Sequence, residues 1–407
     1  MTGSTFFSVA KIPDGGSGGT TQAETRLYNE RLVLSLIRRH GQLSKSDLTR
    51  LTGLAAQTLT TLVNRATDSQ LLVRREPLRG RLGQPSVPYA LNPEGAHAFG
   101  LKIDHRSADL VLVNFTGDVV ALERTTFALP SPREIVGFAR GAIARICRRH
   151  RAIAADRIAG LGIASPFYHG EAGGDGDSRL DEWKQVDVRA ELDGLFDWPV
   201  YLFNDGTVSA GAELMFGAGL GRADFLYAYV GHMIGGGLVL DRHLFPGRNK
   251  LAGAIGAMPV PGRKNGAATL GERASLRALA RRAGSKGDLV WSPEGDWSTL
   301  GRDLAQWIEE LAEGLVHVTR SVVALIDVDG IVVDGAVPPA VRKEIARQLR
   351  RGLATRFLDR PEPFTVVEGS FGHLAPAIGG ASIPLLVKYS NDKEILFKDD
   401  REAVRQA

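Results

Sequence analysis

Cysteine is almost absent from this sequence, and long apolar runs are missing. Cys147 is the one cysteine among 407 residues, which excludes an internal disulfide and a zinc site built from several cysteines. No apolar run approaches the roughly 20 residues needed to span a bilayer, and the first residues lack the charged-then-apolar order of a secretion signal. These absences predict a cytoplasmic protein without a membrane segment, in which Cys147 is a buried filler residue.

Most of the chain also lacks a net charge, because its positive and negative residues nearly balance. The formal net charge is +4, with 43% hydrophobic and 24% charged residues, as in ordinary globular proteins of this length with two or three domains. Residues 1–98 contain 12 Lys and Arg against 7 Asp and Glu, whereas the remaining residues contain 38 against 39. The positive excess therefore lies entirely in the first quarter of the chain, as the neutralisation of nucleic-acid phosphates requires.

Residues 26–91 contain three helical patterns followed by two short strands. Ser44 and Asp47 have the spacing of a capping box, in which a hydroxyl and a carboxylate three residues apart cap free N–H groups. Gly53 is a suitable end for the second helix, whereas Ala55 is a poor N-cap for the third. The residues expected to face inward are Val33, Leu36, Ile37, His40, Leu48, Leu51, Leu59, Leu62, Val63 and Ala66.

The third helix has a polar outer face, and a basic hairpin follows it. Small hydrogen-bonding side chains on such a face can enter a major groove and meet base edges. The hairpin joins strands expected at 71–73 and 87–91, and its arginines suit the DNA backbone or minor groove. The residues expected to contact DNA are Lys45, Gln57, Thr58, Thr60, Thr61, Asn64, Arg79, Arg81 and Gln84. We therefore predict a winged helix-turn-helix over residues 23–95; the alternative is a small three-helix domain with a solvated polar face.

Beyond residue 97 the pattern changes to alternating strands and helices, with polar residues where strands end. The expected strands are 100–104, 109–117, 119–123, 158–164, 200–205, 225–230, 237–240 and 330–334. The expected helices are 132–151, 210–216 and 300–324, the last capped by Ser298 or Thr299. This alternation is typical of an α/β architecture. We place this domain at 96–390, between a linker at 92–95 and a charged tail at 391–407, and we expect residues 1–22 to form a flexible leader.

The order of several short motifs resembles the ROK family of repressors and sugar kinases over nearly the whole chain. The segments that carry the resemblance are 100–117, Gly162–Pro166, Asn204–Asp205, Ala212–Gly217, Gly231–Gly237, Leu251–Ala257 and Ile331–Gly335. Any one of them is a weak signal, but their order and spacing behind a winged helix are specific. The resemblance implies an actin- and hexokinase-like fold of two lobes with a cleft near Asp205, and dimers that assemble through this domain.

Both phosphate loops of the family are altered in this sequence. The resemblance aligns the first loop with Asp104–Ala108, where side chains replace the glycines that let backbone N–H groups approach a phosphate. Arg106 could still offer a positive charge to an anion. The second loop keeps Gly235–Gly237 but has His232 and Met233 in place of the family's Thr-Gly. These glycines could instead serve only a tight hairpin.

The resemblance aligns Asp205 with the family's base, which takes a proton from a sugar hydroxyl. The same carboxylate could hold a sugar without chemistry, or simply cap a strand end. Ala254 and Ala257 stand where the family has a glutamate and a histidine, which removes two polar contacts worth on the order of 1–3 kcal/mol each. Trp183 could line the site or pack in a core. The expected ligand-binding residues are Pro166, Phe167, Trp183, Asn204, Asp205, Gly235, Gly236, Ala254 and Ala257.

The family's cysteine-rich zinc loop corresponds to residues 258–270, which contain neither cysteine nor histidine. With alanine at the family's histidine position as well, a tetrahedral zinc site lacks its ligands. We therefore expect no metal and no cofactor.

Together these patterns predict a DNA-binding transcriptional regulator that is not an enzyme. We expect a cytoplasmic repressor of carbohydrate-related genes, a homodimer or dimer of dimers that binds a palindromic double-stranded operator. Its effector would be a sugar or a sugar derivative. Two alternatives remain open: an ATP-dependent sugar kinase that uses Asp205 as base, and a ligand-independent regulator whose pocket is closed.

Overall fold

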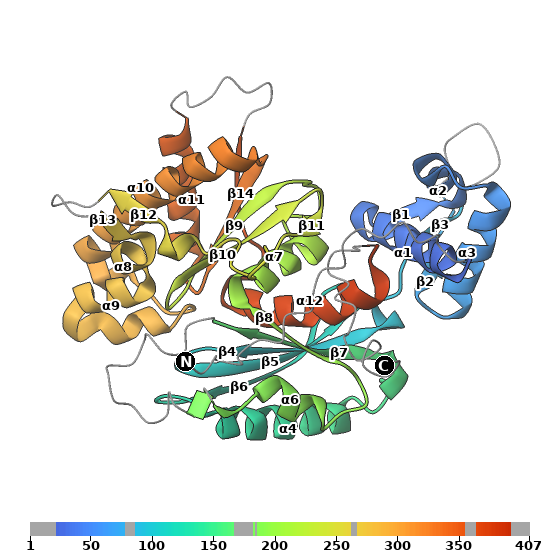
Figure 1. Ribbon diagram of the computed structural model, residues 1–407, viewed down its shortest axis with the longest axis horizontal. Coiled ribbons are helices and arrows are strands. Elements are labelled where there is room, and N and C mark those ends of the chain that lie inside the picture. Colours follow the sequence, from blue (N-terminus) through green and yellow to red (C-terminus); the bar gives the residue numbers. More distant parts are fainter. Residues whose placement is uncertain are drawn as a thin grey trace, which may run out of the picture.

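The computed structural model describes residues 22–77, 86–166, 182–183, 185–261, 267–354 and 364–391. Figure 1 shows a small unit, coloured blue, beside two larger lobes that lie one above the other. We call these parts the N-terminal unit, the first lobe and the second lobe. Almost all of the predicted leader and tail lie outside the described residues.

The N-terminal unit consists of three helices and a small sheet in the strand order β1-β3-β2. Its elements are α1 (Gln22–His40), β1 (Gln42–Ser44), α2 (Lys45–Thr52), α3 (Ala56–Asp68), β2 (Leu72–Arg74) and β3 (Pro88–Leu91). Ser44 caps α2 in the expected capping box with Asp47, and Gly53 ends this helix in the left-handed conformation with φ 69°. A turn of three residues separates α2 from α3, and α3 buries its four expected apolar residues.

Two expectations for this unit are wrong, and two of its features were not predicted. His40, which we expected to face inward, is exposed at the end of α1. Leu34 is buried in addition to Val33 and Ile37, because α1 packs against α3, β3 and a helix near the end of the chain and so needs a broader apolar face. Leu51 is 41% exposed, whereas Leu54 from the following turn packs on the core. Strand β1 was not predicted, because three residues are too few to show a period.

Residues 92–95 form a packed joint where we expected a linker. They include a short 3₁₀ turn, η1 (Pro93–Gly95). The backbone N–H of Asn92 donates to Leu71 in the N-terminal unit, while the carbonyl of Pro93 accepts from Phe115 in the first lobe. A Cβ on Gly95 would lie 2.8 Å from the carbonyl oxygen of Gln70. The N-terminal unit is therefore attached through packed backbone.

The first lobe is a five-stranded sheet in the order β6-β5-β4-β7-β8. Its strands are β4 (His97–Ile103), β5 (Ser107–Asn114), β6 (Val119–Thr126), β7 (Ile158–Ser165) and β8 (Val200–Asn204). Helices α4 (Pro132–Arg149) and α6 (Val188–Asp193) cover the outer face, with the 3₁₀ turn η2 (Ala155–Arg157) before β7. Cys147, which we expected to be buried, is half-buried against this core.

The second lobe is a mixed five-stranded sheet in the order β11-β10-β9-β14-β15. Its strands are β9 (Phe225–Val230), β10 (Ile234–Leu240), β11 (His243–Leu244), β14 (Gly330–Gly335) and β15 (Thr365–Glu368). Its other elements include α8 (Leu270–Ala274), α9 (Leu276–Ala283), α10 (Gly301–Ile326), α11 (Pro339–Leu353), η3 (Ile255–Ala257), η4 (Gly284–Trp291), η5 (Ser298–Leu300), and a hairpin of β12 (Pro259–Pro261) and β13 (Ala267–Thr269). The predicted cap of α10 is wrong: Ser298 and Thr299 form η5, and Leu300 precedes the helix without a side-chain cap.

Two helices lie between the two large sheets. Helix α7 (Asp205–Phe216) packs against β9 and β10 of the second lobe, and α12 (Ala375–Tyr389) packs against β4 and β7 of the first, while both helices pack on each other. A Cβ on Gly162 would lie 1.9 Å from the carbonyl oxygen of Gly380, so glycine allows β7 and α12 to touch through their backbones. Helix α12 was not predicted, because it is buried on nearly every side and shows no amphipathic period.

The alternation of strands and helices predicted from the sequence is confirmed, and most predicted strands match within three residues. None of the helices in the described part of the chain is long and apolar enough to cross a membrane.

Candidate functional site

Helix α3 presents a polar face to solvent. Its apolar residues point into the core of the N-terminal unit, so that Gln57, Thr58, Thr61 and Asn64 are exposed and Thr60 is half-buried. A three-residue turn holds α2 against α3, which is the geometry of a helix-turn-helix. The structure thus brings five of the residues expected to contact DNA onto one helix.

The start of α3 is uncapped. Ala55 makes no side-chain hydrogen bond to the helix, so its first N–H groups keep their hydrogen-bonding capacity. Free N–H groups and the positive end of the helix dipole together form a place where a phosphate can bind. Lys45 from the start of α2 lies beside this helix and donates to Asn64 Oδ1 at 3.0 Å. Arg79, Arg81 and Gln84 lie outside the described residues.

Where the two lobes meet, side chains from two loops are in contact. His105 follows β4 of the first lobe and His232 follows β9 of the second, and their ring centroids are 4.3 Å apart. Trp291 stacks on His232 at 5.2 Å, and the Arg106 guanidinium lies 5.6 Å from the Trp291 ring. Burial lowers the pKa of His232 to about 4, with a further contribution from His105. Burial also lowers the pKa of His105, so both rings are neutral at pH 7.

A line of alternating charges crosses three strands of the first lobe. Lys102 on β4 pairs in register with Asp109 on β5, and Asp109 pairs with Arg124 on β6. The Arg124 Nε lies 2.9 Å from Asp109, and the Lys102 Nζ lies 2.9 Å from Asp104. Burial opposes the charge on Asp104, but Lys102 outweighs it and holds the pKa of Asp104 below its usual range. Sequence reasoning missed this line, although three charged residues at facing positions of apolar strands are a readable signal.

Asn204 and Asp205 stand at the start of α7 with different roles. Asn204 caps the helix by accepting from the N–H groups of Gly206 and Thr207 at 3.0 and 3.3 Å. Asp205 accepts one N–H, that of Gly206, at 2.7 Å. Burial raises the pKa of Asp205 to about 6, and the charge of Asp104 adds to the shift. The capping role considered for Asp205 therefore belongs mainly to Asn204.

Gly235 and Gly236 lie within strand β10, whereas the hairpin turn is formed by the residues before it. A Cβ on Gly236 would lie 2.5 Å from the carbonyl oxygen of Tyr227 and 2.8 Å from that of Gly253. At Gly235 the Cβ would instead face Asp205, 3.8 Å from its Oδ1. Both glycines thus belong to the hairpin of β9 and β10 rather than to its turn: Gly236 permits close backbone packing, and Gly235 leaves space beside the carboxylate.

The remaining candidate ligand residues that the structure describes fall in three places. Ala254 and Ala257 are exposed at η3, three residues apart, and Ala254 follows the glycine that contacts Gly236. Pro166 is half-buried directly after Ser165, which pairs in register with Asn204. Trp183 packs against the core of the first lobe and donates to the Pro130 carbonyl at 2.9 Å. Phe167 lies outside the described residues.

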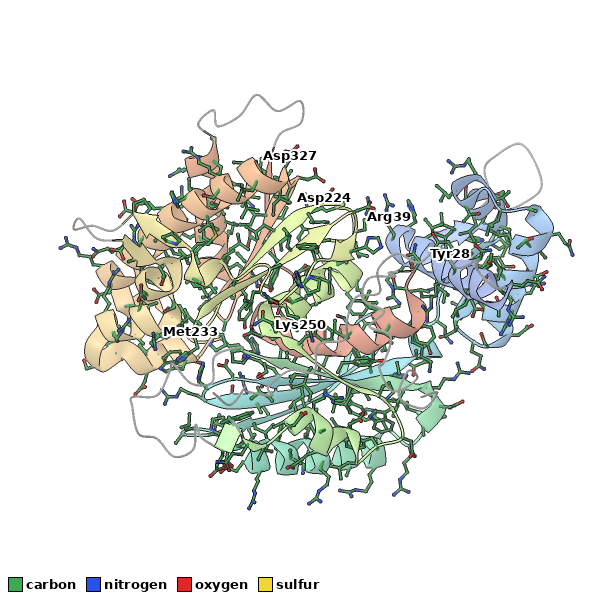
Figure 2. All side chains as sticks on the ribbon, in the orientation of Figure 1. Tyr28, Arg39, Asp224, Met233, Lys250 and Asp327 are labelled. Atoms are coloured by element: carbon green, nitrogen blue, oxygen red, sulfur yellow. The ribbon has the colours of Figure 1, made fainter. Side chains whose placement is uncertain are left out.

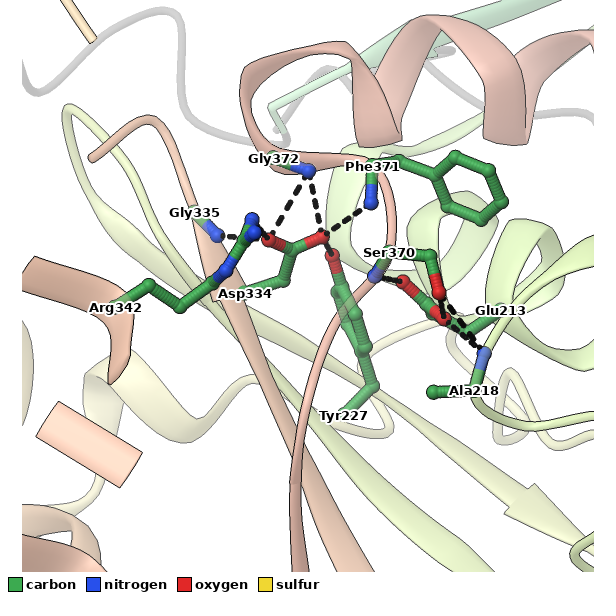
Figure 3. A network of polar contacts seen from close by, with 9 residues as sticks. All are labelled: Glu213, Ala218, Tyr227, Asp334, Gly335, Arg342, Ser370, Phe371 and Gly372. Atoms are coloured by element: carbon green, nitrogen blue, oxygen red, sulfur yellow. Dashed lines mark hydrogen bonds and ion pairs between the residues drawn. The ribbon is translucent and has the colours of Figure 1, made fainter. Parts of the chain in front are cut away.

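A buried polar network connects α7 with residues 370–372, just before α12 (Figure 3). Glu213 on α7 accepts from the N–H groups of Ser370 and Ala218 at 2.6 and 2.7 Å. Asp334 at the end of β14 pairs with Arg342 at 2.8 Å and accepts from the N–H of Gly372. Both carboxylates are 0% exposed. Burial raises the pKa of Glu213 to about 7, so this acid titrates near neutral pH.

No group of three His, Cys, Asp or Glu residues in the described ranges could hold a metal ion. Residues 262–266, part of the segment that corresponds to the family's zinc loop, lie outside those ranges.

Comparison with known proteins places these features in a family context. The model of the ROK family matches residues 107–386. The xylose repressor of Bacillus spizizenii is 21% identical over 239 residues, which cover 59% of this chain and 62% of that protein. The DNA-binding transcriptional repressor Mlc of Escherichia coli is 26% identical over 219 residues, which cover 53% and 54%. The matched region therefore spans less than two thirds of either curated relative.

A solved structure extends the likeness across the N-terminal unit. A crystal structure described as a ROK family transcriptional regulator, homolog of the E. coli MLC protein, has a TM-score of 0.66 at 18% identity, covering 90% of this chain and 97% of that chain. At this identity the likeness concerns the fold, and it confirms the predicted two-lobed, actin- and hexokinase-like architecture.

Proposed function

This chain belongs to the ROK family, and we propose that it is a DNA-binding transcriptional regulator that represses carbohydrate-related genes. The observation that carries the proposal is the exposed polar face of α3, with Gln57, Thr61 and Asn64 held on a helix-turn-helix scaffold. The uncapped start of the helix and Lys45, which lies beside Asn64, supply contacts for a phosphate backbone.

Selection of binding sites from a random DNA library tests this proposal. We expect the purified full chain to enrich one palindromic sequence, because two-fold dimers read two half-sites. Gln57→Ala should weaken binding by about 1–3 kcal/mol and relax the sequence preference at one position of each half-site. Thr67→Ala, at the far end of the same helix, is the matched control and should leave both unchanged. Failure of the wild type to enrich any sequence would refute the proposal.

A sugar-like effector at the start of α7 is the second part of the proposal. Asp205 carries a carboxylate beside the open position at Gly235, and its pKa of about 6 leaves it able to accept or donate hydrogen bonds near neutral pH. The relatives named xylose repressor make D-xylose the first probe, followed by D-glucose and sugar phosphates. Saturable thermal stabilisation that is lost in Asp205→Asn would support the site.

The raised pKa of Asp205 also favours a second candidate, a sugar kinase that uses this carboxyl as base. Against it, side chains of His105, Arg106 and His232 stand in the loops that glycines form in the family's kinases. Sugar-dependent ATP hydrolysis that disappears in Asp205→Asn would establish the kinase. Absence of stabilisation by any probe, with intact DNA binding, would instead favour a ligand-independent regulator.

A further inference from the structure

One arginine of the N-terminal unit contacts both the first lobe and the end of α7. Arg38 lies on α1, and its guanidinium is 4.7 Å from the ring centroid of Phe115 and 5.3 Å from that of Phe216. It also donates to the Phe115 carbonyl oxygen at 2.7 Å. The arginine therefore occupies a slot with an aromatic residue on each side, which we call the Arg38 slot.

The two walls of the Arg38 slot belong to different parts of the molecule. Phe115 directly follows β5 of the first lobe, whereas Phe216 is the last residue of α7. A Cβ on Gly117 would lie 2.4 Å from Phe216 Cγ, so the turn after β5 and the end of α7 are in direct contact. Because α7 begins at Asp205, one helix of 12 residues runs from the proposed effector site to the Arg38 slot.

Other contacts hold the same unit at its edges. Arg157 of the first lobe donates to the carbonyl oxygen of Ser69 at 2.7 Å and to Gln70 Oε1 at 3.0 Å. Ser35 of α1 lies 3.4 Å from the hydroxyl of Ser390, just after α12. These anchors touch the first lobe or the residues after α12, whereas the Arg38 slot includes α7 through Phe216.

The Arg38 slot is a costly position for a cation. Arg38 takes part in no ion pair among those the described residues form, and burial lowers its pKa to about 9. It remains charged at pH 7, so the two ring faces and one carbonyl must compensate for lost hydration. A flat guanidinium suits this geometry, whereas a lysine ammonium would not fill the space between two rings.

We propose that Arg38 is a positioning residue that sets the orientation of the DNA-reading unit and couples it to α7. This proposal rests on the function proposed above. A shift of α7 relative to the first sheet changes the width of the Arg38 slot, and α1 must turn or tilt to keep its contacts. In this proposal the Arg38 slot has two arrangements, and an effector bound at the start of α7 shifts the balance between them through that helix.

Distance measurement between spin labels tests the positioning role without DNA or effector. In a Cys147→Ser background, labels at Asp68→Cys in α3 and Arg140→Cys in α4 report how the unit lies relative to the first lobe, since both positions are exposed. We expect a narrow distance distribution for the parent and a clearly broader one for Arg38→Ala. Arg26→Ala, an exposed arginine on the same helix, should leave the width unchanged. An equal width in Arg38→Ala and parent would overturn the proposal.

Two further variants separate positioning from simple loss of packing. Arg38→Lys keeps the charge but not the planar stack, and Phe216→Leu keeps an apolar wall but not the ring, so both should broaden the distribution while the protein stays folded. Hydrogen exchange of the α7 amides should rise in Arg38→Ala relative to Arg26→Ala, because the far end of α7 loses its partner. Unchanged exchange in α7 would remove the coupling part of the proposal.

DNA binding distinguishes failure of this inference from failure of the proposed function. On the selected operator, Arg38→Ala should bind about tenfold more weakly than Arg26→Ala, since a wider range of orientations lowers the competent fraction. If the parent protein binds no DNA, the proposed function fails, and the distance distributions still decide the role of Arg38. If the parent binds but Arg38→Ala binds equally well with an equal distance distribution, only the inference fails.

Discussion

The N-terminal unit and the region around α7 and α12, between the two large sheets, hold their polar residues in opposite ways. We call this second region the junction. On α3, Gln57, Thr61 and Asn64 are exposed, and the residues that hold the helix in place lie on its other face. At the junction, Glu213 and Asp334 are 0% exposed, and each accepts several hydrogen bonds from backbone N–H groups. Figure 2 shows all side chains of the described residues, with many extending into solvent around the N-terminal unit and around both lobes.

Because of this difference, the exposed polar residues of α3 are not needed for folding, whereas the buried polar residues of the junction are. A polar residue on the outer face of α3 can change without disturbing the core, so the DNA specificity that we propose for this face can vary while the fold persists. The junction has no such freedom, because removing one partner leaves a buried charge or N–H group unsatisfied. Substitutions should therefore sort by region: loss of binding in the N-terminal unit and loss of stability at the junction.

The largest effect is expected where β7 touches α12. Gly162→Ala places a Cβ 1.9 Å from the Gly380 carbonyl oxygen, which is much closer than van der Waals contact. Because the carbonyl oxygen belongs to the backbone and a Cβ is fixed rigidly to the backbone, neither atom can move without separating the sheet from the helix. We expect a loss of at least about 3 kcal/mol of unfolding free energy, measured by urea denaturation followed by circular dichroism.

Gly137→Ala is the matched control for this substitution. Gly137 lies in α4, where an added Cβ would meet nothing within 4 Å, so alanine should stabilise the helix by about 0.5–1 kcal/mol. If Gly162→Ala were as stable as this control, the close approach of α12 would be wrong, and with it the claim that the junction tolerates no change.

The sequence predicted the N-terminal unit and the main strands because local rules dominate there. The Ser44 capping box, the turn at Gly53 and the apolar period of α3 each act within a few residues. Helix α12 was missed for the opposite reason. Its sequence is apolar throughout, and its helical form is favoured by contacts with strands almost 300 residues earlier in the chain.

The candidate site was predictable only in part. Asn204, Asp205 and the glycines of β10 were located from motif order, and the structure brings them together. The contact of His105 with His232 was not predicted, because the two residues lie on loops of different lobes and no local period relates them. The contacts of Arg38 were missed for the same reason: from sequence it is one more arginine on a basic helix, and its two aromatic neighbours lie far along the chain.

An intermediate effect is expected from the pH dependence of stability at Glu213. Its pKa in the folded protein is about 7, above the ordinary value of 4.5, so the folded state binds more protons between these values. Stability from this group is therefore greatest below pH 4.5 and is lost as pH rises through 7. Glu213→Gln should remove this decline, which amounts to on the order of 2–3 kcal/mol. Urea denaturation at a series of pH values from 5 to 8 measures it.

An exposed glutamate supplies the comparison for Glu213. Glu309 on α10 is exposed, and Glu309→Gln should reproduce the pH profile of the parent. Asp205, whose pKa is raised in the same direction, stays in both variants and contributes equally to each. A parallel profile for Glu213→Gln and parent would show that the buried acid is not coupled to folding, and the contrast between the two regions would weaken.

The smallest change in stability is expected at the start of α3. There a substitution that stabilises the protein should weaken operator binding. Ala55 has φ −58° and ψ 140°, a backbone conformation that a capping residue adopts, but it provides no cap. Ala55→Ser should stabilise the protein by about 1 kcal/mol. If the free N–H groups receive a DNA phosphate, the new hydroxyl competes for them, and Ala55→Asp adds repulsion, so operator affinity should fall from parent to serine to aspartate. Thermal denaturation and salt-dependent binding, measured on the same three proteins, would separate the two effects. An increase in both stability and affinity would mean that DNA does not use the start of α3, and the division between a functional surface and its scaffold would then lie elsewhere on the helix.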